Sequence, residues 1–227
     1  MGCIPTPMLP DGVHTFSLTF AQDDREVSIH PAGVETAGGL LLLDVGPRET
    51  LDGLREELAG TGFSFEDVTA VLVTHQDWDH AGGLAALQDV ATPTVLASAA
   101  EAPAVDGRED TRGAGERYPP GRVDVEFESG ITFRTEAGPA RVVPTPGHTP
   151  GHVSVHLPEQ RFLLAADALT ADDAGLQGPN EAFTESMDEA LASAGRLADL
   201  DVETTHCFHG GTVAAGSERI AAIAASR

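Results

Sequence analysis

Lysine is absent from this chain of 227 residues, and its 13 basic side chains are all arginines. They are outnumbered by 36 aspartates and glutamates, so the formal net charge is −23 at pH 7. Proteins that bind nucleic acids gather basic residues to neutralise phosphates, and no segment of this sequence does so. The composition therefore argues against nucleic acid as a partner.

The same charge balance indicates the conditions in which the protein works. A large net charge keeps a chain soluble but makes its parts repel each other, and concentrated salt screens that repulsion. Disorder is the first interpretation of so acidic a chain, but regular apolar segments argue against it. An acidic, lysine-free and folded chain resembles the proteins of salt-loving archaea, so we predict a halophilic source.

Cysteines and long apolar runs are also scarce. Cys3 and Cys207 are too few for a disulfide framework, and we expect both to be reduced thiols in a cytoplasmic protein. No segment approaches the ~18 consecutive apolar residues of a membrane span, so no membrane partner is expected. Residues 1–10 lack a basic stretch followed by an apolar run, and we expect no signal peptide.

The length and an apolar content of 41% fit a single domain over residues 1–227. Apolar periodicity predicts strands at 14–20, 27–29, 39–45, 68–74, 93–98, 123–127, 131–133, 153–157, 161–166 and 202–208. It predicts helices at 49–59, 82–90, 184–200 and 217–226. Strands with helices interspersed imply either two sheets or one sheet between helical layers.

Turn signals divide these segments further. Residues 128–130 lie between two short strands and predict a hairpin, and residues 158–160 predict a second hairpin between 153–157 and 161–166. Residues 99–122 are polar and contain several glycines and prolines. A connection of that length is uncommon unless it has a function, so we predict a functional loop there.

Potential metal ligands concentrate just after the strand at 68–74. Four of them fall within six residues: His75, Asp77, Asp79 and His80. Imidazole together with carboxylate suits zinc, iron or manganese. The alternative is a polar loop with incidental histidines, and the rest of the sequence has to decide between the two.

Three further segments place ligand types at strand boundaries. His148 and His152 occupy a turn before a strand, Asp167 ends a strand, and His206 and His209 end the last strand. With the first segment they hold six of the nine histidines. Because strand ends can meet at one edge of a sheet, we expect all four segments to gather there. An incidental origin does not explain such a distribution.

These segments resemble the signature of the metallo-β-lactamase superfamily. That signature is H-x-H-x-D-H after a strand, then a Gly-His-Thr turn, then an aspartate at a strand end and a late histidine, and the order fits along the whole chain. The resemblance implies an α/β fold, the four-layer αβ/βα sandwich, with metals at one edge between the two sheets.

The resemblance also assigns roles by position. Seven side chains would hold two divalent transition metals: His75, Asp77 and His148 the first, Asp79, His80 and His209 the second, and Asp167 both. Asp79 would be the catalytic residue, because it can orient a metal-bound hydroxide or take its proton. Asp44 matches the acidic strand end of many members and would orient a ligand.

One position departs from the family pattern, since Asp77 stands where the signature has its second histidine. A further carboxylate makes the first site harder and more anionic, which shifts its preference from zinc toward iron or manganese. Zinc remains the first expectation, with iron or manganese as alternatives. A second interpretation is that Asp77 points away from the metal.

The remaining histidines are not predicted ligands: His14, His30, His152, His156 and His206. We expect His152 to be a buried hydrogen-bonding residue and His156 to be structural, while His206 competes with the favoured His209. Cys207 is expected in the core. Trp78, the single tryptophan, is expected to pack against the metal loop or to line the substrate cleft.

The fold does not fix the reaction in this superfamily. Glutathione thioesterases of the glyoxalase II type are disfavoured, because the chain ends soon after His209 and has no lysine. Nucleic-acid-processing members need basic surfaces, true β-lactamases are secreted, and flavodiiron reductases append a flavodoxin domain. What remains is a hydrolase of a small-molecule ester, thioester or lactone. The alternatives are an iron-dependent oxidoreductase such as a sulfur dioxygenase, or a metal-binding protein without turnover.

Overall fold

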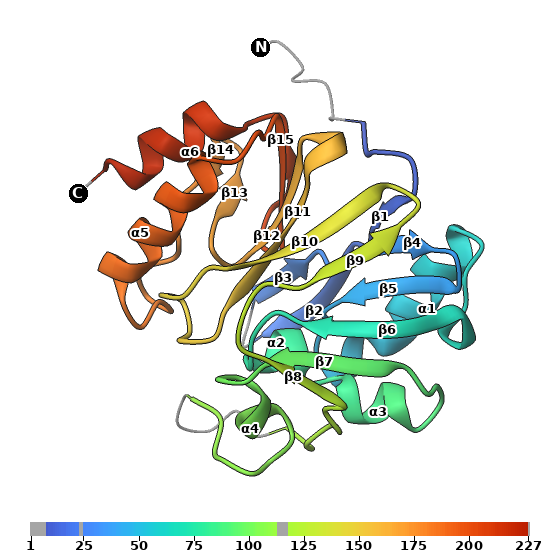
Figure 1. Cartoon of the computed structure of the whole chain (residues 1–227). Helices are drawn as coiled ribbons and strands as arrows, with labels where there is room; N and C mark the ends of the chain where they lie inside the picture. The colour runs from blue at the N-terminus through green and yellow to red at the C-terminus, as the bar shows by residue number, and fades with distance from the viewer. Residues whose placement is uncertain (1–7, 23–24, 113–117, 227) are drawn as a thin grey trace.

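Two six-stranded sheets face each other, and helices cover the outer side of each (Figure 1). The computed structural model describes residues 8–22, 25–112 and 118–226, so Cys3 lies outside the described residues. Within those ranges no helix has the length and apolar character needed to cross a membrane. The fold is the four-layer sandwich that the resemblance predicts.

The first sheet has the strand order β1-β4-β5-β6-β7-β8. Its strands are β1 (Val13–Thr15), β4 (Ala32–Thr36), β5 (Gly39–Leu43), β6 (Val68–Val73), β7 (Thr94–Ser98) and β8 (Val125–Phe127). From β5 to β8 the strands run parallel, whereas β4 is antiparallel to both of its neighbours. The parallel strands include the predicted apolar runs at 39–45, 68–74 and 93–98, and their carboxyl ends meet at one edge.

The second sheet has the order β16-β15-β12-β11-β10-β9. Its strands are β9 (Thr132–Thr135), β10 (Gly138–Pro144), β11 (Val153–Leu157), β12 (Phe162–Ala166), β15 (Thr204–Cys207) and β16 (Gly211–Val213). Only β12 and β15 are parallel neighbours in this sheet. The predicted hairpin of β11 and β12 is confirmed, and the short 3₁₀ turn Pro158–Gln160 connects the two strands.

Two small hairpins and the helices complete the structure. The hairpins are β2 (Leu18–Gln22) with β3 (Arg25–Ile29), and β13 (Thr170–Asp172) with β14 (Gly175–Gln177). The helices are α1 (Leu51–Gly60), α2 (Trp78–Ala81), α3 (Leu84–Gln88), α4 (Ala102–Val105), α5 (Met187–Ala198) and α6 (Ser217–Ala224), with further 3₁₀ turns at Arg48–Thr50 and Phe65–Asp67.

Alternate residues of the central strands build three apolar cores. On β5, Leu40 and Leu42 face the core beneath α1 and α3, while Leu41 and Leu43 face the core between the sheets. A third core packs the outer face of β12 against α5 and α6, and it contains the buried Cys207, as predicted. Side chains on a strand point alternately to opposite faces, so an all-apolar run such as β5 is buried on both sides.

The predicted strand at 14–20 is wrong, because the chain turns within it. β1 ends at Thr15, and β2 begins at Leu18 in a separate hairpin. Val13 belongs to the core between the sheets, whereas Phe16 and Leu18 belong to the core beneath α1. The alternating residues Phe16, Leu18 and Phe20 are buried in one core, as their pattern indicates, but the strand is interrupted because residues 16 and 17 lie between β1 and β2.

Two further predictions need correction. The helix predicted at 82–90 forms but is shorter, because Gly83 donates to the Gly46 carbonyl (N–O 2.8 Å) and only residues 84–88 form α3. The predicted hairpin around 128–130 does not form, since β8 pairs with β7 and β9 pairs with β10 in the other sheet. The chain therefore crosses between sheets at that point, and short-range alternation cannot distinguish such a crossing from a hairpin.

Candidate metal centre

Four loops meet at one edge between the two sheets, and each follows a strand named above. Residues 75–80 follow β6, residues 145–152 connect β10 to β11, Asp167 follows β12, and His209 follows β15. Gly147 gives the second loop its shape with φ at 136°, and a Cβ there would lie 2.2 Å from the backbone nitrogen of Ala190 in α5. Only glycine permits this approach.

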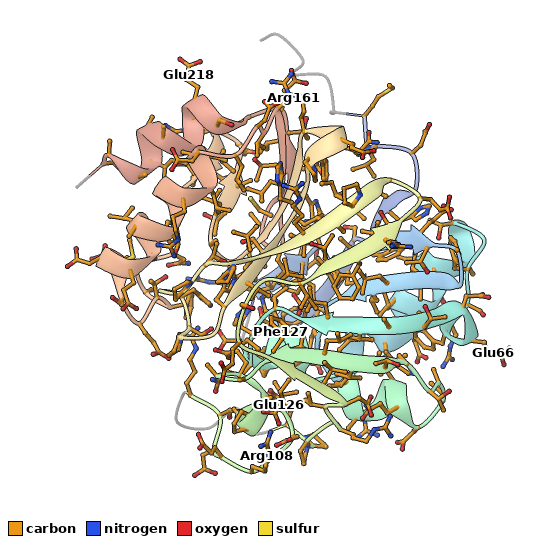
Figure 2. All side chains as sticks on the ribbon, in the orientation of Figure 1. Glu66, Arg108, Glu126, Phe127, Arg161 and Glu218 are labelled. Carbon is orange, nitrogen blue, oxygen red and sulfur yellow. The ribbon has the colours of Figure 1, made fainter. Side chains whose placement is uncertain are left out.

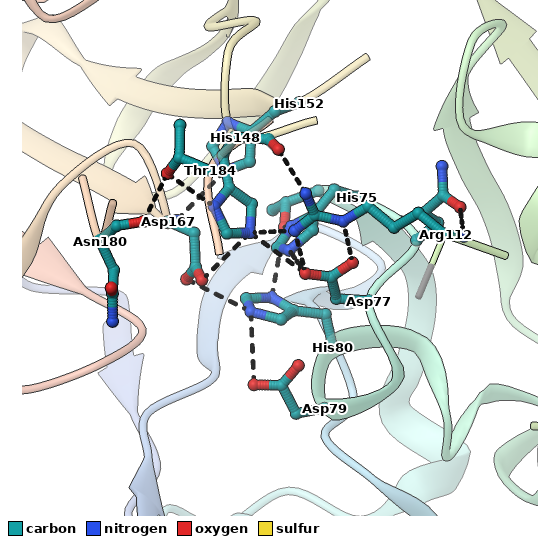
Figure 3. A network of polar contacts seen from close by, with 12 residues as sticks. His75, Asp77, Asp79, His80, Arg112, His148, His152, Asp167, Asn180 and Thr184 are labelled. Atoms are coloured by element: carbon teal, nitrogen blue, oxygen red, sulfur yellow. Dashed lines mark hydrogen bonds and ion pairs between the residues drawn. The ribbon is translucent and has the colours of Figure 1, made fainter. Parts of the chain in front are cut away.

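The seven predicted metal ligands come together in this structure, and Figure 3 labels all of them except His209. They form three overlapping groups whose ligand atoms lie within 4.8 Å of one another: His75, Asp77 and His148; His75, His80 and Asp167; and Asp79, His80 and His209. Within the described part of the chain, none of these groups includes His152 or His206. The loops therefore bring the predicted residues to one place, and which of them bind a metal stays a prediction.

Asp167 occupies the centre of the cluster. Its Oδ1 lies 3.3 Å from Nε2 of His80, and its Oδ2 lies 3.5 Å from Nε2 of His148 and 3.4 Å from Nε2 of His209. Asp79 Oδ2 lies 3.3 Å from Nε2 of His209. Burial lowers the pKa of His209, but Asp167 and Asp79 outweigh it and raise that pKa to about 10. The site is thus strongly anionic and favours a cation.

Three buried atoms in this cluster have no hydrogen-bond partner: His75 Nε2, His80 Nε2 and Asp167 Oδ1. Buried polar atoms are nearly always paired, so three such atoms in one of the ligand groups need an explanation. Two imidazole nitrogens and a carboxylate oxygen are a donor set that suits zinc and similar transition metals. The residues present therefore fit a bound metal ion.

Asp44 orients His80, as expected, by binding the ring nitrogen that faces away from the cluster. Its Oδ2 accepts a hydrogen bond from His80 Nδ1 (2.8 Å), and its two oxygens accept from the backbone and hydroxyl groups of Thr74 at 2.8 and 2.7 Å. With Nδ1 carrying the proton, Nε2 of His80 presents its lone pair to the cluster. Asp44 is itself buried and has φ at 59°.

His152 has the buried hydrogen-bonding role that we predicted. Its Nδ1 bonds with Thr145 Oγ1 at 2.8 Å, and its Nε2 accepts a hydrogen bond from the backbone nitrogen of Asp167 at 3.1 Å. Burial lowers the pKa of His152 well below its ordinary value, which keeps the ring neutral. His152 therefore positions the loop that carries Asp167.

His206 points away from the ligand cluster. It donates from Nε2 to the backbone oxygen of His30 (2.8 Å), and its Nδ1 bonds with Thr212 Oγ1 at 2.8 Å. Burial lowers the pKa of His206 to about 4. Of the two histidines that competed in the sequence, only His209 reaches the cluster. His156 is structural, as expected, because its Nε2 donates to the backbone oxygen of Asp201 (3.2 Å).

The loop at 99–122 supplies two charged residues that the sequence did not single out. Glu101 is fully buried, and its two oxygens accept hydrogen bonds from the backbone nitrogens of Gln76 (2.9 Å) and Gly151 (2.7 Å). It thereby connects two ligand loops. The side chain of Arg112 reaches into the cluster and contacts Asp77 and His148 (Figure 3). In the sequence both were merely charges within a polar loop.

A pocket of about 1520 Å³ opens above the cluster. Its lining includes the cluster residues Asp79, Asp167 and His209 and the aromatic side chains of Trp78 and Phe183. Trp78 lines this pocket, in agreement with its second interpretation, and it packs edge-on against Phe20 of the β2–β3 hairpin with ring centroids 5.3 Å apart. An open pocket with apolar walls and convergent polar groups is the usual form of a small-molecule site.

Comparison with known sequences supports the interpretation of this site. The family model described as "Metallo-beta-lactamase superfamily" matches residues 34–209. The hydroxyacylglutathione hydrolase of Ruegeria pomeroyi is 33% identical over 154 residues, which cover 68% of this chain and 51% of that protein. A probable metallo-hydrolase of Bacillus subtilis is 28% identical over 185 residues, covering 66% of each. The chain spans about half the length of the first of these relatives.

Solved structures show the same fold. A metallo-beta-lactamase family protein of Thermus thermophilus has a TM-score of 0.72 at 24% identity, covering 93% of this chain and 78% of that one. A motif mutant of a metallo-beta-lactamase from Cronobacter sakazakii has a TM-score of 0.73 at 22% identity, covering 98% and 94%. At these identities the likeness concerns the fold alone.

Proposed function

The chain belongs to the metallo-β-lactamase superfamily, and from that premise we propose that it is a metal-dependent hydrolase of a small ester, thioester or lactone. The observation that carries the proposal is the set of three unpartnered ligand atoms, on His75, His80 and Asp167, beside an open pocket. These atoms and the carboxylates around them form a cation site that substrate can reach.

The residues of the cluster suit acyl hydrolysis. When bound, a divalent metal lowers the pKa of its water toward neutrality and polarises a carbonyl oxygen. His80, held by Asp44, and Asp167, positioned through His152, would hold that metal. Asp79 lines the pocket next to His209, and we assign to its carboxylate the task of orienting the attacking water and accepting its proton.

Among the three acyl classes, the relatives favour a thioester. The proteins named hydroxyacylglutathione hydrolase are the kind that the sequence argument disfavoured, yet this chain resembles them over the half that it matches. The match covers 51% and 47% of the length of two of those relatives. We therefore propose a thioester substrate without assigning glutathione as its thiol.

Zinc is the metal that we propose. Asp77 was the reason for considering iron or manganese, because a third carboxylate makes a site harder. Both of its oxygens accept hydrogen bonds from Arg112, so this carboxylate is already engaged. The histidine-rich remainder of the cluster suits zinc, and an iron-dependent oxidoreductase loses its main support.

We also propose that the protein works in concentrated salt in the cytoplasm. The net charge of −23 is the support for the first statement, because screening by salt reduces the repulsion among like charges. The single described cysteine, Cys207, is a free and buried thiol, which agrees with a reducing compartment.

The proposed function is tested with zinc-loaded protein and a panel of activated thioesters, esters and lactones. We expect turnover that a chelator abolishes and that Asp79→Ala reduces at least ~100-fold, the scale of a lost general base. Asp124→Asn is the matched control, because Asp124 accepts a hydrogen bond from the backbone nitrogen of Val95 in β7 and does not contact the cluster. Oxygen consumption by an iron-loaded sample would instead favour the redox alternative.

Two results would overturn this function. One is a complete lack of hydrolysis across the panel with metal bound, and the other is wild-type turnover by Asp79→Ala with its metal retained.

A further inference from the structure

The guanidinium group of Arg112 lies within the first ligand group, which consists of His75, Asp77 and His148. Every N–H of this guanidinium group has an acceptor nearby. Nε donates to Asp77 Oδ1 at 2.6 Å, and Nη2 donates to Asp77 Oδ2 and to His148 Nε2, the latter at 2.8 Å. Nη1 donates to the His148 backbone oxygen at 2.6 Å and lies 3.5 Å from Glu185 Oε1. Guanidinium has five N–H donors in a fixed fork, and this environment matches all of them.

These contacts occupy the atoms that a metal would need. Both oxygens of Asp77 accept from Arg112, and the lone pair of His148 Nε2 accepts an N–H of the same group. In this group only Nε2 of His75 has no hydrogen-bond partner, and it lies 3.4 Å from Oδ2 of Asp77. A metal ion at this position would have to displace a guanidinium group that already satisfies two of the three ligands.

Arg112 is also fixed in place from its backbone. Its own nitrogen donates to Gln76 Oε1 at 2.8 Å, and Glu101 in the same loop bonds to the Gln76 backbone nitrogen at 2.9 Å. Tyr118 donates from its hydroxyl to the Gln76 backbone oxygen at 2.7 Å. Glu101, Arg112 and Tyr118 thus each contact Gln76 in the ligand loop, and these contacts place the guanidinium group beside Asp77.

The charges in the cluster also favour a guanidinium group at this position. Three carboxylates share the cluster: Asp77, Asp79 and Asp167. Like charges in one buried site need cations to neutralise them. Glu185 lies 3.5 Å from Arg112, and the buried Asp44 bonds to His80, so further carboxylates adjoin the three. Arg112 supplies one positive charge to this anionic region, directly against Asp77.

We infer that Arg112 takes the place of the first metal and that the chain binds a single divalent ion, among His75, His80, Asp79, Asp167 and His209. The inference rests on the proposed metal-dependent function. It differs from the two-metal expectation of the sequence, and it explains why Asp77 replaces a histidine. A carboxylate pairs with guanidinium through two parallel hydrogen bonds, whereas imidazole cannot.

Metal stoichiometry tests this inference without reference to activity. Chains are loaded with excess zinc, freed of unbound zinc by gel filtration and measured by elemental analysis. Wild type should hold one zinc per chain. Arg112→Ala should hold two, since both oxygens of Asp77 and Nε2 of His148 are then released for a second ion, and so should the double variant Asp77→His with Arg112→Ala.

Arg108→Ala is the matched control. Arg108 belongs to the same loop and pairs with Asp106 and Glu126, but it lies at the edge of the molecule beside β8 and α4 (Figure 2). This variant should hold one zinc per chain, like wild type. Arg112→Gln replaces Arg112→Ala if the latter does not fold, because it removes the charge and keeps a hydrogen-bond donor.

Each outcome decides something. Two zinc ions per wild-type chain would overturn the inference and leave the hydrolase proposal intact. No zinc in wild type would overturn the inference together with the metal-dependent function. One zinc per chain in folded Arg112 variants would show that this side chain does not exclude the second ion, and would likewise overturn the inference.

Discussion

Asp44→Asn is the substitution that separates orientation of a ligand from ligation itself. Asn keeps the size of the side chain and tolerates the left-handed backbone conformation of residue 44, where φ is 59°. Its amide oxygen can still accept from the Thr74 nitrogen. Its amide NH₂, however, would face the protonated Nδ1 of His80, which now donates to Asp44 at 2.8 Å.

The expected loss of zinc affinity follows from this mismatch between two hydrogen-bond donors. To accept from the Asn amide, His80 has to move its proton to Nε2, the atom that faces Asp167. A metal then either competes with that proton for Nε2, or binds while the hydrogen bond between residue 44 and His80 is lost. Hydrogen bonds to charged groups contribute about 1.5–3 kcal/mol. At about 1.4 kcal/mol per factor of ten, the Kd for zinc should rise roughly 10- to 100-fold.

Competition between the protein and a chromophoric zinc chelator measures this Kd. Asp124→Asn is again the control, because Asp124 also accepts from a backbone nitrogen, at 2.9 Å from Val95, and contacts no histidine. A melting curve of the metal-free variant shows whether the fold is retained. An unchanged Kd in a folded Asp44→Asn protein would refute the idea that Asp44 fixes the proton of His80.

Three further predictions concern stability. The pKa of buried His206 is about 4 in the folded chain and about 6.5 unfolded, so its contribution is present above pH 6.5 and is lost as pH falls toward 4. His206 should account for about 3 kcal/mol of the stability that metal-free protein loses over that window, measured by denaturant titration as the difference in pH dependence between wild type and His206→Gln. Lowering salt from molar to dilute should lower the melting temperature, because 23 net negative charges are then poorly screened; an unchanged circular-dichroism melt would contradict this. Zinc at 100 times its Kd should stabilise the chain by about 2.7 kcal/mol over the chelated form, checked by the same denaturant titration.

The sequence predicted those features that depend on burial or on the order of motifs along the chain. The apolar runs at 39–45 and 68–74 predicted strands because such strands are buried on both faces. The order of the four ligand segments predicted the gathering of all seven side chains. The hairpin at 128–130 was wrong because local alternation does not identify the partner strand.

Arg112 and Glu101 escaped prediction for a different reason. Arg112 acts on Asp77 and His148, which lie 35 and 36 positions away, and Glu101 acts on Gln76 and Gly151, which lie 25 and 50 positions away. Nothing in the neighbouring sequence separates these two side chains from the other charges of their loop. Their roles exist only once the sheets are in contact.

The distribution of the ligand loops over both sheets determines when the centre can form during folding. His75 and His80 follow a strand of the first sheet, whereas Asp167 and His209 follow strands of the second. Contacts between such distant segments form late, because long loops must close first. Neither half of the nascent chain therefore contains a complete binding site, and the metal can stabilise only a chain whose two sheets have already docked.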